Sequence, residues 1–384
     1  MIETDQLGSV RRGREQARLP RAIGRKAMRK VRYAVVGAGW ISQEGFLPAV
    51  PQTGNSEVTA IITGNAEAGR RLAEFHRIER VVGYEDYDAA LASGAFDAVY
   101  VAVPNTLHAR YAVRALERGV HALVEKPLAA SVAECEAMID AAGRGGSFLM
   151  TAYRLHCEPG TVEAVRLVRE GAIGRPRLFS AFFSAQIGDT NHRLSAANWG
   201  GPLQDVGLYC VNAARNILAA EPVEVVAMKG HGDDPCFSEI EESLGAVLRF
   251  PGDALATITV SFNAADVDTY RVVGTEGEIE MQPGFRFETP TRMYLRKGGA
   301  ENVTTFPEID QFGGQIAYFS DCILTGRPPV PDGIEGLADV RALLAIEQAA
   351  KSGMPQLVQS AARASGPTPE MIRLVDRTTR RLVL

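Results

Sequence analysis

The sequence contains few cysteines, and they follow no recognisable motif. Five cysteines are spread over 384 residues, an odd number, and no pair has the Cys-x-x-Cys spacing of zinc and redox sites. A disulfide scaffold and a cysteine metal cluster are therefore not expected. We expect a cytoplasmic protein that holds no metal.

Long hydrophobic runs are also missing. Every apolar run is much shorter than the roughly 20 residues that a membrane-spanning helix needs. Arg11 and Arg12 resemble the start of an export signal, but neither an apolar segment nor a small-residue cleavage site follows them. The sequence therefore predicts neither membrane insertion nor export.

Positive charge is not in excess, since the formal net charge is -5. A protein whose main partner is a nucleic acid usually has a basic face, so nucleic acid is not expected as a partner. Residues 1–30 are the exception, because they combine many basic residues with few acidic ones and show little apolar periodicity. We interpret them as a solvated or disordered basic arm.

The length of the chain predicts two domains, because one core rarely extends over 384 residues. Apolar strands at 33–36, 58–63, 98–103, 121–125 and 148–152 alternate with stretches of helical spacing. Repeats of strand and helix at this pitch form right-handed crossovers. Residues 31–152 are thus predicted to form an α/β Rossmann domain with a doubly wound parallel sheet.

The pattern changes near residue 153. After one helix at 161–170, β-rich runs follow at 177–186, 223–229, 243–250, 254–262, 270–274, 277–281 and 292–296. They predict an α+β domain, residues 153–360, with a large, mostly antiparallel open sheet. Helices are expected at 314–324 and 334–351. The second of them is the C-terminal helix, and packing of this helix back on the first domain is one possible arrangement. Residues 361–384 form a polar tail without a predicted place.

A dinucleotide fingerprint lies where the first apolar run leads into Gly37-Ala-Gly39 and a helix. Gly37 permits a tight turn, and Gly39 lets the backbone approach a pyrophosphate. The helix begins near Trp40 and Ile41, and its N-terminus favours negative charge. Ser42 replaces the third glycine and is small enough for close packing. The segment therefore predicts dinucleotide binding.

The end of the second strand indicates which dinucleotide binds. An NAD-selective enzyme usually places a carboxylate there, whereas this chain has Thr63, Gly64 and Asn65. Arg70 and Arg71 follow on the next helix with charge suited to a 2'-phosphate. The alternative is that both arginines only solvate a helix face. We expect NADP, with NAD less favoured.

Polar residues also end two later strands, at the sheet edge where ligands bind in open α/β folds. Pro104 and Asn105 are expected to face the cofactor. His108 is either a cofactor contact or an ordinary residue at a helix start. Glu125 and Lys126 end the next strand, where an ammonium beside the nicotinamide can hold a substrate hydroxyl and lower the pKa of a neighbour.

A polar stripe marks a later helix that opens with Gly-Gly-Pro. Asp205, Tyr209, Asn212 and Asn216 recur at helical spacing, and such a stripe is often only the solvated face of a helix. Here it begins with a carboxylate and a phenol one turn apart, which can form an acid/base pair.

These residues resemble the glucose-fructose oxidoreductase and inositol dehydrogenase family, often called Gfo/Idh/MocA. The resemblance covers about residues 31–360 and rests on Gly37-Ala-Gly39, Pro104-Asn-Thr-Leu-His108, Glu125-Lys-Pro127, Ala152-Tyr-Arg-Leu-His-Cys-Glu-Pro159 and Gly200-Gly-Pro-Leu-Gln-Asp-Val-Gly-Leu-Tyr209. Most members carry histidine where this chain has Tyr209, which is closer to the glucose-fructose oxidoreductase branch.

The resemblance implies a catalytic pair, Lys126 and Tyr209, a cis peptide after Lys126, and an NADP cofactor able to stay bound through turnover. Tyr209 would take the proton of a sugar C1 hydroxyl while Lys126 stabilises the developing charge. Asp205 would orient the pair or the hydroxyls, and Arg154 and His156 would lie near the sugar.

Two departures from the family pattern stand out. The basic N-terminal segment lacks the apolar signal and the proline-rich arm by which exported members grip a neighbouring subunit. Asn198-Trp199-Gly200-Gly201 stands where three consecutive glycines are common. Export, arm exchange and the shape of the sugar pocket are therefore the properties in which this chain is expected to differ.

The expected function is NADP-dependent hydride transfer at C1 of an aldose or at a ketose carbonyl. The alternative is a non-catalytic NADP- and sugar-binding regulator, which the basic arm favours, whereas Lys126, Asp205 and Tyr209 favour the enzyme. A non-sugar reduction of the biliverdin type fits the polar stripe less well. The open sheet is expected to pack on a copy of itself in a homodimer or homotetramer.

Overall fold

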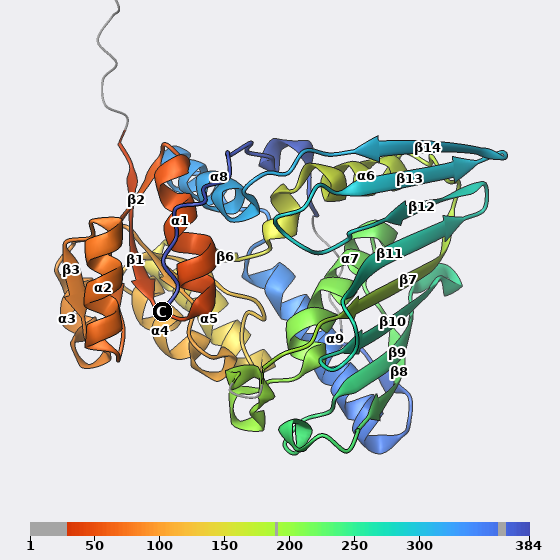
Figure 1. Ribbon diagram of the computed structural model, residues 1–384, viewed down its shortest axis with the longest axis horizontal. Helices are drawn as coiled ribbons and strands as arrows, with labels where there is room; N and C mark the ends of the chain where they lie inside the picture. The colour runs from red at the N-terminus through yellow and green to blue at the C-terminus, as the bar shows by residue number, and fades with distance from the viewer. Residues whose placement is uncertain (1–28, 189–190, 360–365) are drawn as a thin grey trace, which may run out of the picture.

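A computed structural model describes residues 29–188, 191–359 and 366–384, which form two domains that face each other (Figure 1). The basic arm lies outside the described residues apart from Arg29 and Lys30. Among the described residues, no helix combines the length and apolar character that crossing a membrane requires.

The first domain is built on a six-stranded, fully parallel sheet with strand order β3-β2-β1-β4-β5-β6. Its strands are β1 (Val31–Val36), β2 (Ser56–Ile62), β3 (Arg80–Val82), β4 (Ala98–Val101), β5 (His121–Val124) and β6 (Leu149–Thr151). Helices α1 (Leu47–Ala49), α2 (Ala66–His76), α3 (Tyr87–Ala92), α4 (His108–Leu116) and α5 (Val132–Gly145) connect them. The doubly wound parallel sheet is confirmed, with β3 as a strand that the sequence did not predict.

The second domain contains a nine-stranded sheet with order β14-β13-β12-β11-β7-β10-β9-β8-β15. The strands are β7 (Pro176–Ser184), β8 (Glu224–Gly230), β9 (Ser243–Arg249), β10 (Leu255–Ser261), β11 (Val267–Gly274), β12 (Gly277–Met281), β13 (Arg292–Lys297), β14 (Ala300–Thr305) and β15 (Gln356–Leu357). Only β7 and β10 pair in parallel, so the mostly antiparallel sheet is confirmed.

Helices cover one face of this sheet, the face turned toward the first domain (Figure 1). They are α6 (Pro159–Arg169), α7 (Leu208–Leu218) and α9 (Gly333–Ser352). Phe179, Ala181 and Phe183 of β7 point into the core beneath them, whereas Leu178 and Phe182 point to the other face and are exposed. The strand period of two thus leaves an uncovered outer face.

Two helices from the end of the chain reach the first domain. Helix α8 (Gln311–Thr325) packs on its sheet, where the hydroxyls of Ser320 and Tyr33 are 2.8 Å apart and Asn55 Nδ2 donates to the Ala317 carbonyl over 2.9 Å. Helix α9 packs on the opposite side, against α5 and β6. The first sheet is therefore covered partly by helices that follow most strands of the second sheet in the chain.

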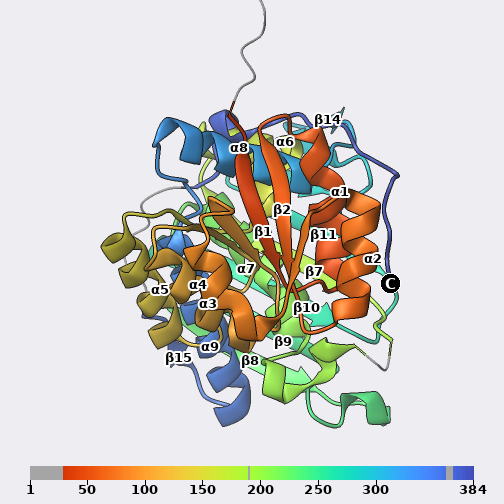
Figure 2. The ribbon, with the colours of Figure 1, turned by 90° about the vertical axis from the view of Figure 1, so that its left-hand side faces the viewer.

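The described part of the tail, residues 366–384, also packs on the first domain (Figure 2). Arg380 donates to the Phe75 carbonyl of α2 over 3.0 Å, and the Leu384 amide donates to Gln43 Oε1 over 2.6 Å. Arg381 forms an ion pair with Glu44. The tail thus has an ordered place that the sequence did not predict.

Candidate active site

A cleft with about 1150 Å³ of open space lies between the carboxyl edge of the parallel sheet and helix α7. Residues of both domains line it, among them Gly39, Trp40, Ile41, Asn105, His108, Glu125, Lys126, Arg154, Arg193, Gln204, Asp205 and Tyr209. Most of the residues that the motifs singled out therefore meet in one place, although they come from segments far apart in the chain.

The turn after β1 has the geometry that the fingerprint predicted. Gly37 has a φ of +98°, and a Cβ there would lie 2.5 Å from the Ala102 carbonyl oxygen, so only glycine fits. Ser42 Oγ donates to the Gly37 carbonyl over 2.6 Å. Nothing lies within 4 Å of a Cβ on Gly39, which leaves the space that the approach of a pyrophosphate requires.

The residues predicted to select NADP lie outside the cleft, at the start of α2. Asn65 caps this helix by accepting the Ala68 amide over 3.0 Å, and the Asn65 amide donates to Thr63 Oγ1. Arg70 folds back along the helix, because its Nε donates to the Ala66 carbonyl over 3.2 Å. Its cation is thereby held near the loop that ends β2.

His108 is a buried brace between two loops. Its Nδ1 lies 2.9 Å from the Pro127 carbonyl and its Nε2 lies 2.9 Å from the Val103 carbonyl. Burial lowers the pKa of His108, although these carbonyls oppose the effect. His108 begins α4 and thus has the helix-start position that one alternative expected. Because it also lines the cleft, its contact with the cofactor stays a prediction. Its ring ties together the loops after β4 and β5.

The loop after β4 touches the second domain through Asn105. Its Nδ2 donates to the Trp199 carbonyl over 3.1 Å, in the segment where the family usually has three glycines. Pro104 precedes it and lies outside the cleft lining. Asn105 therefore joins the cofactor edge of the sheet to the opposite wall of the cleft.

Glu125 and Lys126 leave β5 in different directions. Glu125 is buried and accepts a hydrogen bond from the Tyr100 hydroxyl over 2.7 Å. Burial raises the pKa of Glu125, although Tyr100 and Lys126 oppose this. The peptide between Lys126 and Pro127 is cis, as the resemblance implied.

Lys126 forms an ion pair across the domain boundary. Its Nζ lies 2.7 Å from Asp205 Oδ1, and Arg193 Nε lies 3.1 Å from Asp205 Oδ2. Burial disfavours both charges, but the Asp205 carboxylate outweighs it and raises the pKa of Lys126. Arg193 and Lys126 likewise outweigh burial and hold the pKa of Asp205 well below its usual range. Both residues are therefore charged at neutral pH.

Tyr209 lies beside this ion pair, with cations around its ring. Lys126 Nζ is 4.7 Å from the ring centroid, and Arg154 Cζ is 4.8 Å from it. Further along the helix, Asn212 and Asn216 are buried, so the interpretation of the stripe as a solvated face is wrong. The stripe begins in the cleft at Asp205 and Tyr209 and continues into the protein interior.

Arg154 and His156 lie on different sides of the turn at Arg154–Cys157. Arg154 lines the cleft, but its guanidinium donates to Gln311 Oε1 and, over 2.6 Å, to the Phe285 carbonyl. His156 lies outside the cleft, with its Nε2 2.9 Å from Asn212 Oδ1. The structure therefore does not bring His156 to the predicted sugar position.

Several cleft residues were missed or only weakly indicated by the sequence. Arg193, His192, Phe287 and Phe312 lie in no motif, and Gln204 lies in the motif at 200–209 without having been singled out. Phe287 lies in an irregular loop after β12, so no periodicity marks it. In the parts of the chain that the structure describes, no cluster of three His, Cys, Asp or Glu side chains could hold a metal ion.

Comparisons with known proteins agree with this geometry. Residues 31–153 match a model of the oxidoreductase family with an NAD-binding Rossmann fold, and residues 161–280 match the GFO/IDH/MocA C-terminal domain. A D-xylose 1-dehydrogenase [NADP(+)] of Haloarcula marismortui is 32% identical over 330 residues, which is 84% of this chain and 91% of the relative.

Solved structures show the same fold. An aldose-aldose oxidoreductase from Caulobacter crescentus, in complex with glycerol, is 35% identical with a TM-score of 0.81 and covers 86% of this chain and all of its own. KijD10, a 3-ketoreductase from Actinomadura kijaniata in complex with NADP and TDP-benzene, is 28% identical with a TM-score of 0.77, covering 83% of this chain and 98% of its own.

Proposed function

The chain belongs to the Gfo/Idh/MocA family of oxidoreductases, and on this premise we propose that it is an NADP-dependent sugar oxidoreductase. The proposed reaction moves a hydride between the nicotinamide and C1 of an aldose, or a ketose carbonyl. One observation carries the proposal: Lys126, Asp205 and Tyr209 meet in a cleft that begins at a dinucleotide turn. Relatives named as sugar oxidoreductases support it.

The residues around the turn fit NADP. The open space above Gly39 and the helix N-terminus near Trp40 and Ile41 suit a pyrophosphate. Thr63, Gly64 and Asn65 offer no carboxylate to a ribose hydroxyl. Two relatives carry NADP(+) in their names, which supports the same choice. When bound, NADP supplies the acceptor for the hydride of the sugar.

The charges of Lys126 and Asp205 leave Tyr209 as the residue that would exchange a proton with the C1 hydroxyl of the sugar. Lys126 already holds its proton and Asp205 stays ionised, so neither exchanges a proton readily at neutral pH. Tyr209 is the remaining acid/base group of the three. In its phenolate form it would accept the C1 hydroxyl proton as the C1–H bond breaks, leaving a carbonyl at C1. Lys126, 4.7 Å from the ring centroid, would stabilise the phenolate.

Arg193 and Arg154 have different proposed roles. Arg193 holds the second oxygen of Asp205, which keeps this carboxylate oriented between two cations. Arg154 is occupied by Gln311 and Phe285, so it would act on the sugar mainly through its position beside Tyr209. Substrate binding would therefore depend on Lys126, Asp205 and Tyr209 more than on Arg154.

The decisive experiment is an absorbance spectrum of the purified protein, recorded before and after aldoses are added without external nicotinamide. A band of reduced cofactor that forms with one sugar and disappears with a second aldose or a ketose would support a tightly bound, cycling NADP. Turnover only after NADP⁺ is added would indicate a plain dehydrogenase. No reaction in either case would contradict the enzyme and favour the non-catalytic regulator.

The proposal also includes a homo-oligomeric assembly and a cytoplasmic location. The uncovered face of the second sheet would pair with a second copy, giving a homodimer or a tetramer built from such dimers. All five cysteines are free thiols, and most are buried, which fits a reducing cytoplasm.

A further inference from the structure

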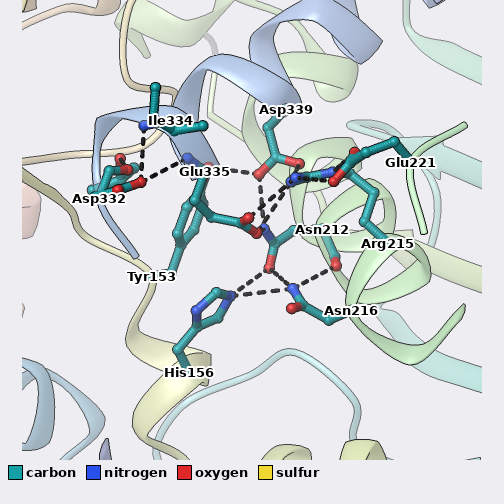
Figure 3. A network of polar contacts seen from close by, with 11 residues as sticks. Tyr153, His156, Asn212, Arg215, Asn216, Glu221, Asp332, Ile334, Glu335 and Asp339 are labelled. Carbon is teal, nitrogen blue, oxygen red and sulfur yellow. Dashed lines mark hydrogen bonds and ion pairs between the residues drawn. The ribbon is translucent and has the colours of Figure 1, made fainter. Parts of the chain in front are cut away.

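The polar stripe of α7 ends in a closed network behind the cleft (Figure 3). Asn212 lies one turn beyond Tyr209, and its Nδ2 donates to Asp339 Oδ2 over 2.8 Å. Its Oδ1 lies 2.9 Å from His156 Nε2 and accepts Asn216 Nδ2 over 2.9 Å. Asn212 therefore fixes the helix that carries Tyr209 to residues from two other segments.

Asp339 is the centre of this network. It is fully buried on α9 and accepts the Tyr153 hydroxyl over 2.5 Å, beside the hydrogen bond from Asn212. Its other oxygen binds the guanidinium of Arg215, which is also fully buried on α7. One carboxylate thus joins α7 to α9 and to the segment where the chain leaves the first domain.

Helix α9 cannot shift easily against the first domain. A Cβ on Gly336 would lie 2.5 Å from Thr151 Oγ1 and 2.7 Å from Leu128 Cδ2, so helix and strand are in direct contact there. Leu128 lies two residues after Lys126. Asp339 is consequently held in a fixed position relative to the catalytic lysine.

The proposed catalytic residues, in contrast, are divided between the domains. Lys126 follows β5 of the first domain, whereas Tyr209 is the second residue of α7. Their mutual placement depends on how α7 sits against α9, because α9 is docked on the first domain. The network is the polar link between these two helices.

We propose that Asp339 is a positioning residue for Tyr209. The carboxylate of Asp339 acts through Asn212 and holds α7 in the place where the Tyr209 ring faces Lys126. The inference rests on the proposed function, since it requires Lys126 and Tyr209 to act together. Asp339 touches neither the cleft nor the reacting atoms.

The charge of the network makes this placement depend on pH. Asp339 faces Arg215 and Asn212 of α7, Glu335 of its own helix and Tyr153, and Arg215 also binds Glu221. Burial raises the pKa of Asp339 to about 6, with Arg215 opposing and Glu335 adding to the rise. Protonation below this pH would remove the ion pair with Arg215, so turnover should fall as the pH falls.

The same raised pKa separates positioning from stability. The folded protein keeps a proton that the unfolded chain releases near pH 4, so stability declines as the pH rises through the pKa of Asp339. Ionised Asp339 therefore costs stability at neutral pH. The stability of the fold and the turnover of the enzyme should therefore depend on pH in opposite directions.

The first test compares Asp339→Asn with Glu221→Gln, which removes a carboxylate bound to the same guanidinium. We expect kcat of Asp339→Asn to fall about 10- to 100-fold at neutral pH, with KM nearly unchanged, because small misplacements of reacting groups cost this much. Its free energy of unfolding in urea is measured alongside, because the new amide nitrogen would face the donors Asn212 and Arg215, and the loss of kcat must exceed any loss of folded protein. The fall in kcat below pH 6 should vanish in Asp339→Asn and persist, at lower pH, in Glu221→Gln.

Asn212→Ala cuts the link but leaves the Asp339–Arg215 ion pair, and it should show the same loss of kcat. It also serves if Asp339→Asn does not fold. Wild-type kcat and an unchanged pH profile in Asp339→Asn would overturn the proposal, as would a loss of kcat that follows only the fraction of folded protein.

A second readout needs no turnover, so it decides the inference even if no aldose is oxidised. Fluorotyrosine placed at position 209 of the full chain should show a ¹⁹F shift with a midpoint near pH 6, absent in Asp339→Asn. A resonance that does not move, or that moves equally in both proteins because of groups such as His192 in the cleft, would overturn the inference.

Discussion

At the scale of single residues, Lys126 and Asp205 fix each other's protonation state. The Asp205 carboxylate raises the pKa of the ammonium, while Arg193 and Lys126 together lower the pKa of the carboxylate, so both groups stay charged. A charged lysine can stabilise a developing negative charge but cannot accept a proton. This is why the proton transfer is assigned to Tyr209, and why Lys126 is assigned to electrostatic stabilisation.

Lys126→Met should remove the chemical step while leaving fold and cofactor binding intact. Methionine keeps the unbranched stem but has no ammonium, so we expect kcat to fall about 100- to 10,000-fold. The measurement is kcat with the best aldose of the panel, together with the affinity for NADPH from its fluorescence. Retained turnover, with unchanged NADPH affinity, would defeat the assignment of Lys126.

Arg70→Ala should weaken NADP⁺ binding selectively. The arginine is held back toward the loop after β2, where a 2'-phosphate is expected, so its loss should raise KM for NADP⁺ about tenfold. KM for NAD⁺ should change little because NAD⁺ has no 2'-phosphate. Arg71→Ala is the matched control on the same helix, and equal effects of both variants would contradict a specific role of Arg70.

The site could be predicted from the sequence where a motif sits at the end of a regular element. Gly37, Lys126 and Tyr209 were found in this way, because strand ends and helical spacing fix their direction. His156 could not be placed, since consecutive side chains of the short turn at Arg154–Cys157 point to different sides. Phe287 and Phe312 reach the cleft only through tertiary packing.

At the scale of elements, the fold was predictable because regular strands and helices leave a periodic apolar pattern in the sequence. Buried strands such as β1 and β4 read as apolar runs between turns, and both sheets were recognised from them. Strands β3 and β15 have only three and two residues, and all six residues of β14 are exposed. Without buried side chains these strands lack the apolar pattern that identifies the others.

Close contact between α9 and the first domain gives a prediction about stability. Gly336→Ala would force a methyl group against Thr151 and Leu128, so it should lower the free energy of unfolding by about 1–3 kcal/mol. Gly143→Ala is the control, because nothing lies within 4 Å of a Cβ at that position of α5. The control should be neutral or more stable, since alanine is the better helix former.

Both variants would be measured by urea unfolding monitored by circular dichroism. Gly336→Ala would also displace Asp339, which lies one turn further along α9. The kcat of Gly336→Ala should therefore fall, whereas the kcat of Gly143→Ala should not. Equal stability of the two variants would show that the helix shifts freely on the sheet, against the rigid docking inferred above.

At the scale of the whole molecule, the helices of the described residues leave the outer face of the second sheet bare. Phe182, Thr259, Gly245 and Met228 pair in one row across β7, β10, β9 and β8 on the outer face of the second sheet. Phe182 is 51% exposed and Met228 is 80% exposed. Exposed apolar side chains such as Phe182 and Met228, at the two ends of this row, often mark a protein interface.

Phe182→Lys should therefore dissociate the proposed homo-oligomer. A two-fold interface repeats every substitution on both sides, so the variant would bury two ammonium groups, at a cost of several kcal/mol. Light scattering coupled to gel filtration should give a mass near that of one chain for the variant and a multiple of it for the wild type. Leu374→Lys changes an apolar residue that is even more exposed, at 72%, but lies outside the sheet, and it should keep the wild-type mass. A monomeric wild type would contradict the proposed homo-oligomer. The exposed Phe182 and Met228 would then need another explanation, because their face of the sheet would have no partner in solution.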